Sequence, residues 1–168
     1  GYSKAMIANI SGAWGLGMTI LGALLGGSLA TRFGILRPLL AAAFLAAVTN
    51  LLFAWMAGQD GATHALVLTI SADNLSGGLA GSVFIAWLSS LTNVRYTATQ
   101  YALFSSLMTL PGKFLSGFGG IVVDAMDYPT FFTLSALLGL PAVGLVLIIM
   151  KYQPAPATVD APTRGDGE

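Results

Sequence analysis

Residues 128–150 read YPTFFTLSALLGLPAVGLVLIIM, a run without a charged side chain. A helix needs about 20 mostly apolar residues to cross the hydrocarbon core of a bilayer, so this run predicts a membrane-spanning helix. The whole chain of 168 residues has a similar character, with 55% hydrophobic and 8% charged residues. A soluble domain carries about 25% charged residues, and a disordered chain has low hydrophobicity. The composition therefore argues against both classes and predicts an integral membrane protein.

The placement of the charges predicts the other spans. Uncharged runs cover 5–31 and 38–59, and two further long runs are each interrupted by one charge, at Asp73 and at Lys113. We therefore expect an all-α integral membrane protein with five transmembrane helices, over about 5–31, 36–57, 64–91, 98–123 and 128–150. The connecting loops are short, so helices adjacent in sequence should run antiparallel.

Basic and acidic loops alternate along the chain. The basic positions are Arg32, Arg37, Arg95 and Lys151, and the other two loops hold Asp60, His64, Asp124 and Asp127. Because Lys and Arg in short loops face the cytoplasm, we expect the N-terminus outside and the C-terminus in the cytoplasm. Lys4 is the one charge that departs from this pattern.

The residues at the two ends of the chain predict a disordered tail and a longer transmembrane domain. Residues 153–168 contain three prolines, small residues and mixed charge, so we expect a disordered cytoplasmic tail there. The chain begins with Gly1 rather than Met and enters its first span at once. We therefore expect residues 1–152 to be part of a longer transmembrane domain.

Two charges lie at membrane depth. An acid there costs about 2.5–3.5 kcal/mol on insertion scales and usually faces an interior or a cavity. At 1.5 Å per residue, Asp73 and Lys113 fall at similar depth in antiparallel neighbours, which favours an ion pair or contact of Lys113 with an anionic substrate. The alternative for each is to extend outward to the interface. Pro111-Gly112 should weaken or kink the helix beside Lys113.

Small residues and span polarity predict how the helices pack. The pairs Gly22/Gly26, Gly77/Gly81 and Ser116/Gly120 have the spacing that lets helix backbones approach closely. Asp73, Gly77, Gly81 and Phe84 should share one helical face. The spans 36–57 and 128–150 are almost wholly apolar and are expected to face lipid, while the other three should line something polar.

The inventory of reactive residues argues against catalysis. The chain has no cysteine and one histidine, His64, at a loop edge, so it lacks a thiolate and a membrane-embedded base. Asp73 has no second acid at membrane depth with which to form a catalytic dyad. The net charge is zero, which does not favour nucleic acid. We expect no enzyme activity, no cofactor, no metal site and no nucleic-acid partner.

The segment GGSLATRFGILR, residues 26–37, resembles the cytoplasmic loop signature of the major facilitator superfamily. Its conformational loop residues would here be Gly27, Arg32, Gly34 and Arg37, while Thr31 replaces the acid of that signature. The segments DNLSGG (73–78), YTATQYAL (96–103), PGK (111–113) and DAMDYPTFF (124–132) resemble muropeptide permeases of the AmpG type.

This resemblance covers about residues 1–152 and carries its own expectations. It implies helices 8–12 of a twelve-helix transporter that lacks its N-terminal half here. It also implies proton-coupled import of anhydro-muropeptides across the bacterial inner membrane by alternating access. The substrate or proton pathway would contain Asp73, Asn74, Gln100, Tyr101 and Lys113. Acetyl-coenzyme A transporters are similar in this region, so that class or another organic anion is an alternative substrate. A membrane module without transport activity is a further alternative.

Overall fold

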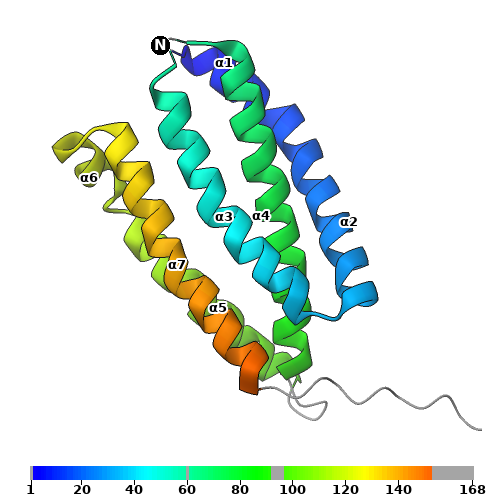
Figure 1. The fold of residues 1–168 in the computed structure, drawn as a ribbon. Coiled ribbons are helices and arrows are strands. Elements are labelled where there is room, and N and C mark those ends of the chain that lie inside the picture. Colours follow the sequence, from blue (N-terminus) through cyan, green and yellow to red (C-terminus); the bar gives the residue numbers. More distant parts are fainter. Residues whose placement is uncertain (1, 60, 92–96, 153–168) are drawn as a thin grey trace, which may run out of the picture.

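The computed structural model describes residues 2–59, 61–91 and 97–152, and these ranges contain helices and connections without a strand. In chain order the elements are α1 (Lys4–Asn9), η1 (Ile10–Trp14), α2 (Gly15–Phe33), α3 (Leu36–Ala57), α4 (Thr63–Leu91), α5 (Thr97–Ser116), α6 (Gly119–Ala125) and α7 (Tyr128–Tyr152). The all-α membrane fold class is therefore confirmed. Long helices occupy each of the five predicted places, and α2, α3 and α4 form a bundle (Figure 1).

Two of the long segments are not continuous α-helices. The first contains η1, a single π-helical turn with a wider hydrogen-bonding ring, between α1 and α2. The other runs as an α-helix through Pro111-Gly112, where we expect a weakened or kinked helix, and ends at Ser116. The interruption falls instead at Gly117 and Phe118, before α6. Glycine is a poor helix former, and Gly117 is followed closely by Gly119.

Four segments are long and apolar enough to cross a membrane by length and composition: Lys4–Phe33, Leu36–Ala57, Ala98–Ala125 and Tyr128–Tyr152. α4 has 29 residues and falls outside this set. It carries Asp73 and Asn74 near its middle, together with several small residues. This polar helix lies between α2 and α3 (Figure 1). Its position shields the polar stretch from the surface that would meet lipid.

The contact between α2 and α4 depends on three glycines. The backbone of Leu75 lies where a Cβ on Gly22 would be, and the backbone of Thr19 lies where a Cβ on Gly78 would be. Gly26 is covered by the Ser82 hydroxyl and by the backbone of Leu79. Gly22 and Gly26 thus pack closely, as their spacing predicts. The pair Gly77/Gly81 does not, because both positions face open space and Gly78 takes that role.

α3 packs on two sides, against α4 and against α7. A core of Leu39, Ala42, Leu79, Val83 and Val146 joins the three helices. At the other end of α3, Phe53 stacks on Phe132 of α7 with ring centroids 4.9 Å apart. Two sides of α3 are therefore covered by other helices, and only its remaining surface is left for the expected contact with lipid. The small side chains of Ala42 and Ala47 allow this close packing.

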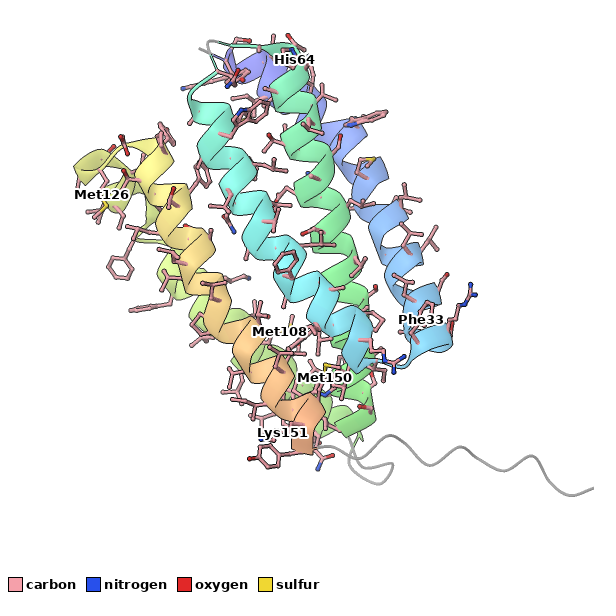
Figure 2. The ribbon with its side chains drawn as sticks, viewed as in Figure 1. Phe33, His64, Met108, Met126, Met150 and Lys151 are labelled. Atoms are coloured by element: carbon pink, nitrogen blue, oxygen red, sulfur yellow. The ribbon has the colours of Figure 1, made fainter. Side chains whose placement is uncertain are left out.

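The loops gather at two ends of the bundle. The N-terminus, the turn before α4 and the connection before α7 lie at one end, with His64 (Figures 1 and 2). The turn after Phe33 and the end of α7, with Lys151, lie at the opposite end (Figure 2). Neighbouring long helices therefore run antiparallel. Asp60, Arg95 and the tail 153–168 lie outside the described residues.

We expect Gly78→Ala to destabilise the protein by about 1–3 kcal/mol, because the added methyl group collides with the backbone of Thr19. Gly77→Ala is the matched control, since its methyl group would enter open space and raise helix propensity. The measurement is the thermal unfolding midpoint of detergent-purified protein. Equal midpoints for the two variants would show that α2 and α4 do not pack as described.

Candidate functional site

A cavity of about 790 Å³ lies at the end of the bundle that holds the N-terminus. Four segments form its wall: the N-terminal residues, the end of α3, the first half of α4 and the connection from α6 to α7. The lining residues used below are Tyr2, Phe53, Asp73, Asn74, Asp124, Asp127, Tyr128 and Phe132. Its size falls in the range of about 300–1,000 Å³ that is common for small-molecule sites.

Asp73 is half-buried in the wall of this cavity. Its polar neighbour across the helix pair is the side chain of Thr49 on α3. Thr49 is 3% exposed, and its hydroxyl also donates to the Ala46 carbonyl oxygen at 3.0 Å. Asp73 thus lies beside a buried hydroxyl that is bonded within its own helix.

Asn74 lies beside Asp73 in sequence but connects α4 to a different helix. Its Nδ2 donates to the Ile70 carbonyl oxygen at 2.9 Å, and its Oδ1 accepts from Thr19 Oγ1 of α2 at 3.0 Å. Gly15 is buried against this amide, and a Cβ there would come within 3.2 Å of Asn74 Nδ2. Asn74 therefore joins the first and third predicted spans at the level of the cavity.

The π-helical turn η1 (Ile10–Trp14) lies directly before this contact. Trp14 Nε1 donates to Ser71 Oγ of α4 at 2.8 Å, and Ser71 Oγ donates to the Val67 carbonyl oxygen at 2.6 Å. Such turns are frequent at functional sites because they displace side chains from the regular helix. The sequence analysis missed Thr49, Trp14 and Ser71, since each gains its role from a contact with another helix.

The predicted residues of α5 lie elsewhere. Lys113 is exposed, and within the described residues no ion pair joins it to Asp73. Gln100 and Tyr101 are half-buried, and none of these three residues lines the cavity. The structure thus brings Asp73 and Asn74 together and leaves the α5 residues apart from them.

The loop between α2 and α3 lies at the end opposite the cavity. Gly34 has φ 77°, a left-handed conformation that other residues rarely adopt, and it ends α2. Arg32 lies over the Phe33 ring at 5.3 Å, while Arg37 and Gly27 are exposed. The α2–α3 loop and the acid Asp73 therefore lie at different levels of the bundle.

At the rim of the cavity, Asp127 begins α7. The backbone N–H of Thr130 donates to Asp127 Oδ1 at 2.8 Å, the geometry of a helix N-cap. Hydrogen bonds from the hydroxyl and the backbone N–H of Thr130 hold the pKa of Asp127 below its ordinary value. The described residues contain no group of three or more His, Cys, Asp or Glu that could hold a metal.

The chain is similar to several bacterial transporters. It is 31% identical over 152 residues to a Rickettsia conorii protein named as transporter AmpG 4, which covers 90% of this chain and 36% of that protein. It is 30% identical over 153 residues to the anhydromuropeptide permease of Escherichia coli (strain K12), covering 91% of this chain and 31% of the permease. A Rickettsia bellii protein named as transporter AmpG 1 is 30% identical over 150 residues, which is 89% of this chain and 36% of that protein.

The resemblance to AmpG-type permeases is therefore confirmed along most of the chain, which spans about a third of the length of these relatives. No family model matches the chain. No solved structure matches it either.

We expect Asp127→Ala to loosen the first turn of α7, because the substitution removes the acceptor for the Thr130 N–H. Hydrogen exchange over residues 130–133 should become faster at neutral pH. Asp124→Ala is the matched control, since Asp124 lies in the last turn of α6 (Gly119–Ala125).

The effect should depend on pH. The pKa of Asp127 is lower in the folded protein than in the unfolded chain, so its ionised carboxylate stabilises the fold at pH values above the unfolded-state pKa. This stabilisation is lost as the pH falls through the folded-state pKa. The difference between wild type and Asp127→Ala should therefore vanish on acidification. A difference that persists at low pH would rule out the carboxylate cap.

Proposed function

We propose that this chain is part of a secondary active transporter of the major facilitator superfamily, and that it supplies helices 8–12 of twelve. The similarity to named transporters supports a transport function. The fold supports it too, because the bundle exposes many large apolar side chains. Examples are Leu103, Leu107, Leu110, Phe114, Ile121 and Leu138. These surfaces are suited to lipid and to the N-terminal half of the same transporter.

The observation that carries the proposal is the half-buried Asp73 in a cavity within a membrane bundle. An acid at such depth is costly, and acids in this situation commonly bind protons or substrates. Asp73 then binds the coupling proton, which enters from the end of the bundle that holds the cavity. Protonation of the carboxylate removes the free-energy cost of burying a charge in the low-dielectric interior, and this permits the helices to move.

The proposed substrate is inferred from the similar proteins. The E. coli protein is an anhydromuropeptide permease by name, so we propose import of anhydro-muropeptides across the bacterial inner membrane. Lys113 is exposed on α5, and in this proposal its cation contacts a substrate anion or the other half of the transporter. Gln100, Tyr101 and Asn74 complete the proposed pathway.

The same proposal includes an orientation. Arg32, Arg37 and Lys151 belong to the end of the bundle opposite the cavity, and the basic end faces the cytoplasm. The cavity then opens toward the periplasm, where proton activity is higher in a respiring cell. The loop of Gly27, Arg32, Gly34 and Arg37 lies on the cytoplasmic side and changes conformation during transport.

In cells that produce the full-length protein, uptake of labelled anhydro-muropeptide should collapse when an uncoupler is added. Asp73→Asn should lower the uncoupler-sensitive uptake by about tenfold or more, because the amide cannot release a proton. Asp73→Glu, which keeps a titratable carboxyl, should retain proton-dependent uptake at a changed rate.

Uptake by Asp73→Asn that equals wild type would overturn the role of Asp73. Absence of uptake by wild-type protein that is verified in the membrane would overturn the muropeptide substrate. Coenzyme A thioesters would then be the first organic anions to test.

The orientation is tested with single cysteines, since the chain contains none. We expect Thr63→Cys to react with a membrane-impermeant maleimide in spheroplasts, because Thr63 is exposed at the cavity end. Thr31→Cys, exposed in the last turn of α2, should react after the membrane is opened. Any cysteine elsewhere in the full-length protein is first replaced. The reverse labelling pattern would contradict the orientation.

A further inference from the structure

The first transmembrane segment changes its packing at Gly15. Residues 2–14, which precede this position, include no buried residue, whereas Gly15, Gly22 and Gly26 of α2 are buried and face α4. Gly15 lies against the amide of Asn74, and Thr19 Oγ1 is hydrogen bonded to Asn74 Oδ1 at 3.0 Å. The helix is therefore fixed to α4 from Gly15 onward, and the part before Gly15 is not.

The π-helical turn η1 (Ile10–Trp14) lies at this boundary. The N–H of Gly15 donates to the carbonyl oxygen of Ile10, five residues earlier, and also to that of Gly12. A π-helical turn interrupts the regular α-helical ladder of hydrogen bonds, and helices bend at such turns. At η1 the first segment can therefore change direction without any change in the packing of α2 on α4.

Two hydrogen bonds connect the part before Gly15 to α4 and to the turn that precedes α4. Trp14 Nε1 donates to Ser71 Oγ at 2.8 Å, and the Tyr2 hydroxyl donates to the Ala62 carbonyl oxygen at 3.3 Å. The indole of Trp14 is 54% exposed, so burial does not fix it in place. The position of residues 2–14 thus depends on a few polar contacts that can break and form again.

The same part of the chain forms one wall of the cavity, through Tyr2, Ile7 and Ser11. On α4, Ser71 precedes Asp73 and Asn74 within a single helical turn. The hydrogen bond that holds η1 to α4 therefore lies beside the proposed proton-binding acid. A rotation of residues 2–14 about η1 would change the width of the cavity next to Asp73.

We propose that η1 is a hinge, and that the hydrogen bond from Trp14 to Ser71 holds it in the position described here. When this bond breaks, residues 2–14 turn about η1 away from α4 and widen the mouth of the cavity. The inference rests on the transport function proposed above and deepens it, because the hinge controls entry to the cavity that contains Asp73.

The test uses the full-length protein and separates the turn from its hydrogen bond. Deletion of Ala13 removes one residue from the π-helical turn, so that residues 4–33 can form a continuous α-helix. Trp14→Phe and Ser71→Ala each remove the hydrogen bond and leave the turn intact. Trp55→Phe is the matched control, because Trp55 is also an exposed tryptophan, 43% exposed, but lies on α3.

The first readout is the distance between spin labels on Ala5→Cys of α1 and Thr133→Cys of α7, both at exposed positions. We expect two distance populations in the wild type and one after deletion of Ala13. Trp14→Phe should raise the ratio of the longer to the shorter distance by about fivefold, the effect of one lost hydrogen bond. Ser71→Ala should act equally, and the two changes together should add nothing further.

Distances that are the same in the wild type, Trp14→Phe and Ser71→Ala would overturn the inference, and so would an equal shift in Trp55→Phe. This comparison stands even if the deletion variant does not fold. Any other cysteine of the full-length protein is replaced before labelling.

The second readout is uptake of labelled anhydro-muropeptide. Deletion of Ala13 should lower uptake by about tenfold or more while the protein reaches the membrane and keeps its thermal unfolding midpoint. Trp55→Phe should keep wild-type uptake. Uptake by the deletion variant that equals wild type would show that transport does not use the hinge. If wild-type uptake is absent but the distances respond as expected, the proposed substrate fails and the hinge stands.

Discussion

The structure depends on one constraint: the polar middle of α4 cannot face hydrocarbon. Asp73 and Asn74 are adjacent, and successive helical residues point in directions about 100° apart, so one neighbouring helix cannot cover both. The chain therefore places a helix on each side. Asn74 is bonded to Thr19 of α2, while Asp73 lines the cavity together with Phe53 at the end of α3. The order α2, α4, α3 in space follows from this requirement, although α3 precedes α4 in sequence (Figure 1).

The close approach of α2 supports this arrangement energetically. In a bilayer the lipid tails are as apolar as the helix surfaces, so association relies on packing and on hydrogen bonds between helices. Gly22 and Gly78 permit backbone contact, and the bonds of Thr19 and Trp14 to α4 lie on the same side. α3 instead uses larger side chains against α4 and α7. One side of α4 is thus packed backbone to backbone, whereas its other side holds a titratable group beside a cavity.

This asymmetry suits a transporter. A closely packed pair such as α2 and α4 can act as one rigid body, and the other side of α4 carries Asp73, the proposed proton-binding group. The cavity places that group within reach of one end of the bundle, and the basic loop lies at the other end. In the proposed transport cycle, proton binding and the α2–α3 loop would be linked through helices rather than through direct contact.

The sequence by itself determined the fold class, the places of the long helices, the membrane-depth acid and the close packing at Gly22 and Gly26. These features depend on local composition, because an uncharged apolar run spans a bilayer wherever its neighbours lie. Only the tertiary structure decided that Gly78 rather than Gly77 meets α2 and that α3 is covered on two sides. It also decided that, among the described residues, Asp73 lines the cavity without an ion pair to Lys113. The reason is rotational: a helix that is apolar nearly all round does not encode which face turns inward, and small or polar contacts on its neighbours make that choice.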